Sequence, residues 1–161
     1  MNSYDKDADE FFMKQALNEA KKAFDADEVP VGAVVVLDGR VIARAHNQVE
    51  LLKDATAHAE MLAITAASSS IGDWRLLNTT LYTSLEPCSM CAGAILLSRV
   101  KRLVWGAKDL RCGANGTWVD LFAMEHPFHK TEVQGGVLEG QAADLLRRFF
   151  QKKRSDSDTS I

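Results

Sequence analysis

The stretch from Thr80 to Ala107, TLYTSLEPCSMCAGAILLSRVKRLVWGA, predicts a strand, a helix and a second strand in succession. The strands span Thr80 to Ser84 and Leu103 to Ala107, because both runs are rich in apolar, β-branched and aromatic residues. Pro87 suits the start of the helix, since its missing N–H costs no hydrogen bond at the first helical position. Two strands joined through a helix normally run parallel with a right-handed connection. This unit therefore favours an α/β fold.

Two cysteines occupy the first turn of the expected helix. Cys88 and Cys91 are three residues apart, so both sulfur atoms can face one ion. The positive end of the helix dipole also favours the thiolate form that zinc requires. A third ligand, His58, lies in the sequence TAHAE at residues 56–60. Three protein ligands with one open position are typical of a catalytic zinc site, in which a water molecule becomes acidic enough to ionise near neutral pH.

Glu60 follows the histidine by two residues, and we interpret it as a proton shuttle beside that water, not as a ligand. Two other roles for the cysteine pair account for fewer of these residues. A redox-active dithiol leaves His58 and Glu60 without a role, and a structural zinc site needs a fourth ligand. The candidates for a fourth ligand have no helpful spacing: His46, Cys112, His126 and His129. The residues therefore favour catalytic zinc, with Cys112 as a loop thiol without a metal role.

The remaining elements follow from hydrophobic periodicity. The Asp-Gly pair at residues 38–39 predicts a hairpin between strands over 31–37 and 41–45. Helices are expected over 7–25, 58–72, 118–124 and 139–154, with a polar loop over 48–55 and a short strand over 131–134. Together these elements predict a three-layer α/β/α sandwich around a mixed sheet of about five strands. We expect residues 1–154 to form one domain and residues 155–161 to be a disordered tail.

Length and composition support this assignment. The chain has 161 residues, 47% of them hydrophobic and 25% charged, which are ordinary values for one globular domain. It lacks the run of about eighteen apolar residues that a membrane span needs, so no membrane association is expected. The acidic, polar N-terminus is unlike a secretory signal peptide. Three cysteines do not make a disulfide framework, which indicates a reducing cytoplasm.

The charge distribution bears on possible partners. A net charge of −3 argues against a nucleic-acid binder when it is considered alone. Two groups of basic residues, however, leave room for a local basic face. The first group is Arg99, Lys101, Arg102, Lys108 and Arg111, and the second is Arg147, Arg148, Lys152, Lys153 and Arg154. On charge alone, the second group is more often a solvated helix face than an RNA contact.

Asn47 stands where the second strand of the hairpin ends. Loops at strand ends commonly hold ligands, and an amide that both donates and accepts hydrogen bonds suits the edge of a nucleobase. The sequence pattern alone favours the simpler interpretation of a turn-forming asparagine.

Beyond the zinc residues, the chain resembles the bacterial tRNA adenosine deaminases of the zinc-dependent cytidine/deoxycytidylate deaminase family. The resemblance extends from about Glu10 to Lys153 and includes the signature H-x-E followed by P-C-x-x-C. The matching stretches are EVPVGA at 28–33, Asn47, TAHAE at 56–60, LYTSLEPCSMCAGA at 81–94, Ser98-Arg99, GAKD at 106–109, Gly113-Ala114 and 145–150. Ala55 departs from the proline that is common in the family, and the loop over 48–53 also differs.

The resemblance implies hydrolysis of adenosine to inosine at the wobble position, position 34, of a tRNA anticodon. It implies a cytidine-deaminase-like fold and a homodimer with one zinc ion per subunit, acting on a tRNA anticodon stem-loop and not on DNA. It carries over His58, Cys88 and Cys91 as ligands, Glu60 as the proton shuttle and Asn47 as a contact to the flipped base. Regions that approach RNA in the family match Lys108, Asp109 and the C-terminal basic residues.

Two other functions compete with this interpretation. A deaminase of free guanine or cytosine would use the same zinc site, and the negative net charge favours it mildly. The flanking matches oppose that alternative. A non-enzymatic RNA-binding module stapled by zinc would have no need of Glu60 beside an open coordination position.

Overall fold

A mixed five-stranded sheet forms the centre of the computed structural model, which describes residues 5–159. The strand order is β2-β1-β3-β4-β5. β1 lies antiparallel to both β2 and β3, whereas β3, β4 and β5 run parallel. The strands are β1 (Gly32–Leu37), β2 (Arg40–His46), β3 (Thr80–Leu85), β4 (Arg102–Ala107) and β5 (Glu132–Gln134). The expected mixed sheet is confirmed.

The hairpin between β1 and β2 turns at the expected Asp-Gly pair. Asp38 has φ 49° and Gly39 has φ 73°, and Leu37 pairs with Arg40 across the turn. Positive φ at both central residues defines the turn whose twist matches that of two antiparallel strands. The short connection fixes the register of β2, which brings Asn47 to the end of the sheet where the helices α3 (Ala59–Ile71) and α4 (Ser89–Leu97) begin.

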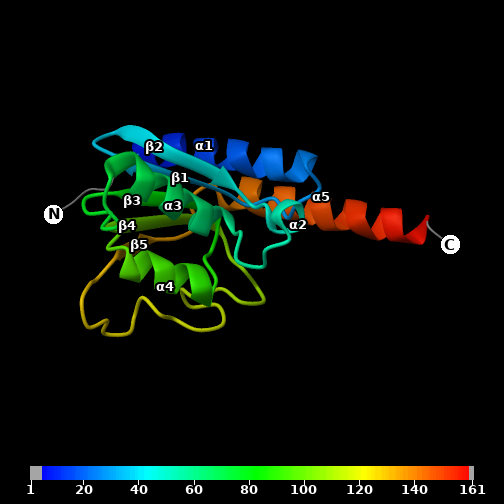
Figure 1. Ribbon diagram of the computed structural model, residues 1–161. Helices are drawn as coiled ribbons and strands as arrows, with labels where there is room; N and C mark the ends of the chain where they lie inside the picture. The colour runs from blue at the N-terminus through cyan, green and yellow to red at the C-terminus, as the bar shows by residue number, and fades with distance from the viewer. Residues whose placement is uncertain (1–4, 160–161) are drawn as a thin grey trace.

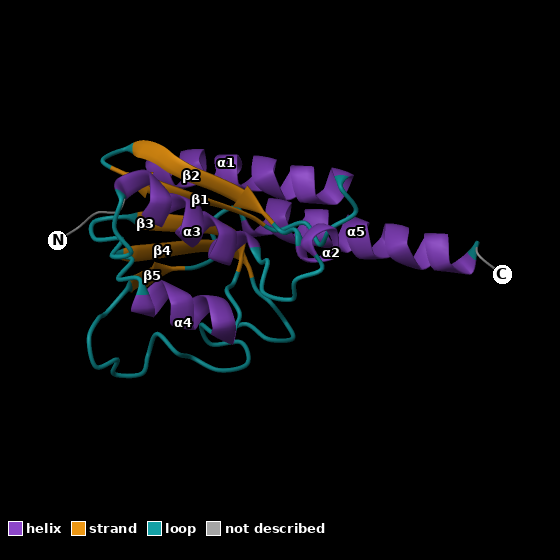
Figure 2. Cartoon of the chain, in the orientation of Figure 1, coloured by secondary structure: helices purple, strands orange, loops and turns teal. Residues whose placement is uncertain are grey.

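Helices cover both faces of the sheet (Figures 1 and 2). α1 (Lys6–Asp25) and α5 (Glu139–Asp158) pack on one face, where Met13 and Ala142 enter a core with Val34 and Val104. α3 (Ala59–Ile71) and α4 (Ser89–Leu97) cover the other face, and their buried side chains include Ala63 and Ile95. This arrangement confirms the three-layer α/β/α sandwich.

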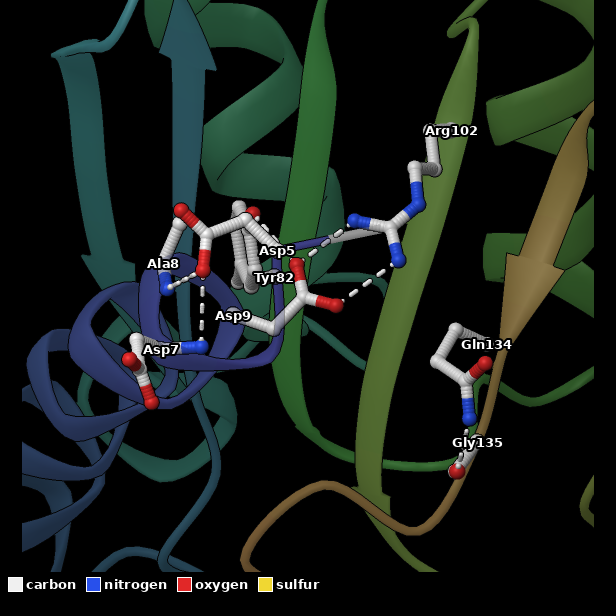
Figure 3. A network of polar contacts seen from close by, with 8 residues as sticks. All are labelled: Asp5, Asp7, Ala8, Asp9, Tyr82, Arg102, Gln134 and Gly135. Atoms are coloured by element: carbon white, nitrogen blue, oxygen red, sulfur yellow. Dashed lines mark hydrogen bonds and ion pairs between the residues drawn. The ribbon is translucent and has the colours of Figure 1, made fainter. Parts of the chain in front are cut away.

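The N-terminal helix is tied to the sheet by a buried ion pair (Figure 3). Asp9 of α1 accepts two hydrogen bonds from the Arg102 guanidinium, at 2.6 and 2.8 Å, and one from the Tyr82 hydroxyl at 2.9 Å. At the start of the same helix, Asp5 caps the backbone N–H groups of Asp7 and Ala8.

The structure corrects three expectations. Residues 118–124 form turns and not a helix, because Asp120 accepts hydrogen bonds from the backbone N–H groups of Phe122 and Ala123 and the Gly113 carbonyl accepts from Trp118 and Val119. The polar loop contains a short helix, α2 (Val49–Leu52). α5 continues through Asp158, so residues 155–158 of the expected disordered tail are helical, while residues 160–161 lie outside the described part of the chain.

Across residues 5–159, no helix is both long enough and apolar enough to cross a bilayer.

Candidate active site

The three expected metal ligands lie at the beginnings of two helices. His58 is the residue before α3, Cys88 is the residue before α4, and Cys91 lies in the first turn of α4. The helix thus begins at Ser89 and not at Pro87, which places Cys88 at its N-cap. Both helix N-termini point their positive ends at the same place, so the fold favours thiolates there.

The spacing of the ligand atoms fits a zinc ion. His58 Nδ1 lies 3.6 Å from Cys88 Sγ and 3.6 Å from Cys91 Sγ, and the three ligand atoms lie within 4.8 Å of one another. Tetrahedral zinc with ordinary Zn–N and Zn–S bonds places such atoms about 3.5–3.8 Å apart. Within residues 5–159 this is the one group of three His, Cys, Asp or Glu side chains with metal-binding geometry. One imidazole and two thiols leave one tetrahedral position for water or substrate.

The two thiols titrate very differently in the protein alone. The pKa of Cys88 is lowered to about 4, chiefly by the Cys91 side chain and also by His58, both of which lie beside its sulfur. The neighbouring Cys88 sulfur, together with burial and Glu60, raises the pKa of Cys91. The pKa of His58 is raised, chiefly by its hydrogen bond to Cys88. Cys88 is therefore the more acidic of the two thiols.

Glu60 lies beside the ligands and is buried. Its Oε2 accepts a hydrogen bond from Cys91 Sγ at 3.2 Å, and its Oε1 accepts one from the Thr83 hydroxyl at 2.9 Å. Burial raises the pKa of the Glu60 carboxyl. A carboxyl whose pKa is moved toward neutrality both takes up and returns a proton readily.

Thr83, on the central strand β3, is a contributor that the sequence analysis missed. Its hydroxyl orients Glu60 from a position 23 residues away in the chain. A threonine in a strand is ordinary, so no sequence signal distinguished it.

A cavity of about 970 Å³ opens above these residues. His58, Glu60, Cys88 and Asn47 line it, together with residues from four further segments. Those segments are the loop at 26–29, the α2 residues 49–51, Asp109 with Cys112, and the α5 residues Phe149, Phe150 and Lys153. The volume is typical of a pocket that encloses a small organic ligand.

Asn47 has an unused hydrogen-bonding atom in this cavity. The residue is 8% exposed, and its Nδ2 donates to the Val29 carbonyl at 3.3 Å. Its Oδ1 is buried and has no hydrogen-bond partner among the described residues. A buried polar atom without a partner is costly, so this oxygen is suited to accept a hydrogen bond from a ligand.

The other two expected RNA contacts, Lys108 and Asp109, differ in their position relative to the cavity. Asp109 lines the cavity and accepts hydrogen bonds from the backbone N–H groups of Arg111 and Cys112 and from the Cys112 thiol. Lys108 is exposed and does not line the cavity. Cys112 lines the cavity although the residue is exposed. Partial desolvation and its hydrogen bond to Asp109 raise the pKa of its thiol to about 11, so the thiol stays protonated at neutral pH.

Several C-terminal basic side chains already have acidic partners. Arg147 and Arg148 both pair with Asp144 on α5. Lys153 pairs with Asp27 at 2.6 Å across the border of the cavity.

Comparisons with known proteins agree with this geometry. The sequence profile of the cytidine and deoxycytidylate deaminase zinc-binding region matches residues 6–107. The chain is 50% identical over 146 residues to the tRNA-specific adenosine deaminase of Bacillus subtilis, covering 91% of each chain. It is 53% identical over 159 residues to the chloroplastic tRNA(adenine(34)) deaminase of Arabidopsis thaliana, covering 89% of this chain but 12% of that protein.

Solved structures show the same fold. A chain from studies of A-to-I editing by tRNA:A34 deaminases at the wobble position superposes with a TM-score of 0.81 at 46% identity, covering 84% of this chain and 99% of that one. The guanine deaminase of Nitrosomonas europaea superposes with a TM-score of 0.73 at 29% identity, covering 87% and 83%.

Proposed function

The chain belongs to the cytidine and deoxycytidylate deaminase family, and we propose that it hydrolyses adenosine to inosine at the wobble position of a tRNA anticodon. The observation that carries the proposal is the juxtaposition of the buried Glu60 carboxyl with the ligand atoms of His58, Cys88 and Cys91. Glu60, His58 and Cys88 line one cavity, and Cys91 is buried behind them. The level of identity to the tRNA deaminases favours an RNA substrate.

In this proposal, His58, Cys88 and Cys91 would hold a zinc ion, which would lower the pKa of a bound water molecule to near neutrality. Glu60 accepts the proton of the attacking water as its oxygen bonds to C6 of adenine. Glu60 then gives that proton to ring nitrogen N1 and carries the proton of the new C6 hydroxyl to the exocyclic amine. The C6–N bond breaks as the C6 carbonyl forms, and ammonia leaves. The balance is adenosine plus water to inosine plus ammonia. Thr83 keeps the Glu60 carboxyl oriented during both transfers.

The target base must leave its stack before C6 can reach the cavity floor. An anticodon loop presents unpaired bases, so the cost of extruding one is small. Asn47 Oδ1 accepts a hydrogen bond from the base in this proposal, which gives that buried atom the partner it lacks within the described residues. Asp109 contacts the nucleotide from the cavity wall, while Lys108 approaches the RNA outside it.

We further propose that the enzyme acts as a homodimer in the cytoplasm. The described surface exposes large apolar side chains, among them Leu97 and Trp118, and these would be buried in a subunit interface. The cytoplasm is where a tRNA substrate and reduced thiol ligands occur together.

A free-base deaminase remains the second candidate, because the guanine deaminase of Nitrosomonas europaea shares the fold at 29% identity. A substrate panel separates the two candidates. Purified zinc-loaded protein is incubated with an anticodon-arm RNA that carries wobble adenosine, and separately with adenosine, guanine and cytosine. Inosine in the RNA together with ammonia release is the expected result, and turnover of a free base alone would reassign the enzyme.

A further inference from the structure

Two buried glutamates border the cavity and have no part in the chemistry proposed above. Glu28 lies between α1 and β1, Glu86 lies between β3 and α4, and they are 2% and 1% exposed. We propose that both are positioning residues, each of which holds one wall of the cavity by accepting hydrogen bonds from its backbone. This inference rests on the proposed function, because the walls are taken to shape the entrance for the target nucleotide.

Glu28 holds the wall formed by α2. Its Oε2 accepts a hydrogen bond from the Glu50 N–H at 3.0 Å, and its Oε1 accepts one from the Leu51 N–H at 2.7 Å. α2 has four residues, none of them buried, so neither its length nor a packed apolar face holds it in place. The carboxylate of Glu28 therefore supplies the fixed point for a segment that lines the cavity at Val49, Glu50 and Leu51.

Glu86 holds a second wall, the loop over 109–117. Its Oε2 accepts hydrogen bonds from the Asn115 N–H at 2.9 Å and the Thr117 N–H at 3.4 Å, while its Oε1 accepts one from the Thr117 hydroxyl. The loop backbone packs directly on the carboxylate, because a Cβ at Gly113 would lie 2.3 Å from Oε2. This loop carries Asp109 and Cys112 to the cavity.

The chemistry of the two contacts requires a carboxylate. A buried charge is costly unless donors satisfy it, and hydrogen bonds from backbone N–H groups to a carboxylate are stronger than those to a neutral acceptor. Glutamine has the same shape but replaces one acceptor oxygen with an NH₂ group. At residue 28 that group would face a backbone N–H donor in either orientation. At residue 86 it would face either two backbone N–H donors or the Thr117 hydroxyl, which would then have to turn from donor to acceptor. The exchange of Glu for Gln therefore loosens the wall without emptying the core.

The test uses Glu28→Gln and Glu86→Gln, with Glu19→Gln as the control. Glu19 is also buried, but its carboxylate pairs with the side chains of Lys22 and His46 and does not line the cavity.

Zinc content, amide hydrogen exchange, and KM and kcat on anticodon-arm RNA are measured for each protein. We expect full zinc content and about tenfold faster exchange, over residues 49–52 in Glu28→Gln and over 113–119 in Glu86→Gln. KM should rise about tenfold with kcat changed less than about twofold, while the control keeps the wild-type exchange and KM.

Unchanged exchange or an unchanged KM in both variants would overturn the proposal, as would a fall in kcat with loss of zinc, which would assign the glutamates to the metal site. If Glu86→Gln does not fold, Thr117→Val removes one of its hydrogen bonds and should still raise KM, whereas Thr117→Ser should restore the wild-type value. If the wild type turns over a free base and not the RNA, the proposed function fails, and the same KM comparison on that base decides the role of the walls.

Discussion

Cys91 links the metal site to Glu60 through one buried hydrogen bond. The neighbouring Cys88 sulfur, burial and the Glu60 carboxyl all raise the pKa of its thiol. Zinc binds thiolates, so uptake of the ion must release the proton of Cys91. The affinity of the site for zinc therefore depends on pH.

We predict that zinc affinity increases with pH. Below the raised pKa of Cys91, each unit of pH increase should raise the apparent association constant by at least about tenfold, because at least one proton leaves for each ion bound. Competition with a chromophoric chelator between pH 6 and 8 measures this slope. An affinity independent of pH would show that both thiols are already ionised before the metal binds.

Asn47 is the residue whose substitution should affect substrate binding most selectively. Asn47→Ala removes the unpartnered oxygen and should lower kcat/KM on anticodon-arm RNA about ten- to thirtyfold, mainly through KM. Zinc content should not change. Asn18→Ala, at an exposed position of α1, is the matched control. A variant of Asn47 with wild-type KM would remove this residue from the binding site.

At the residue scale, the sequence predicted the side chains that the structure brings together in the candidate site, but not the residues that hold them. His58, Glu60, Cys88 and Cys91 were identifiable because their types and local spacing carry zinc chemistry. Thr83, Glu28 and Glu86 were not, since their partners lie 22 to 31 residues away and two of them bind backbone atoms of irregular segments. Backbone donors leave no residue pattern to detect.

At the scale of elements, periodicity located the long helices and central strands to within a few residues. The segments without periodicity were assigned wrongly. The helix expected over 118–124 is replaced by turns that the Asp120 side chain caps, and α2 was hidden in a polar loop because it buries none of its residues. The end of α5 was placed too early because residues 155–158 are polar and show no apolar stripe.

The attachment of α1 to the sheet gives a prediction for stability. Asp9→Ala should lower the free energy of unfolding by about 3–5 kcal/mol, since it removes the carboxylate that accepts two hydrogen bonds from the buried Arg102 guanidinium. Thermal or denaturant unfolding measures the change. Asp7→Ala, an exposed change in the same helix turn, should cost less than about 1 kcal/mol. Equal stability of the two variants would contradict a structural role for the ion pair.

On the scale of the whole molecule, α5 extends beyond the sheet (Figure 1). Residues in the middle of this helix, Phe149, Phe150 and Lys153, line the cavity. Phe149 is 3% exposed and packs on Phe24 of α1, with the ring centroids 5.8 Å apart. Lys153 pairs with Asp27 one turn later. The C-terminal end of α1 and the loop after it therefore pack against α5 at one side of the cavity.

Truncation of α5 should leave stability and substrate binding unchanged until the cut removes the residues that contact α1 and the cavity. Ending the chain after Arg154 keeps both contacts and should leave stability and KM near wild type. Ending it after Leu146 removes Phe149 and should cost about 3–5 kcal/mol of stability, with a strong loss of substrate binding. Unfolding curves and RNA binding by the two proteins measure this. Equal behaviour of the two truncations would show that the cavity does not need α5.

The role of Glu60 is the central claim, and single-turnover deamination by zinc-loaded Glu60→Ala tests it most directly. Anticodon-arm RNA is mixed with excess enzyme, and zinc content is measured in the same samples. We predict full zinc content with a rate of inosine formation at least about a thousandfold below wild type, because the proton of the attacking water has lost its acceptor. A zinc-loaded variant that forms inosine at the wild-type rate would contradict the account.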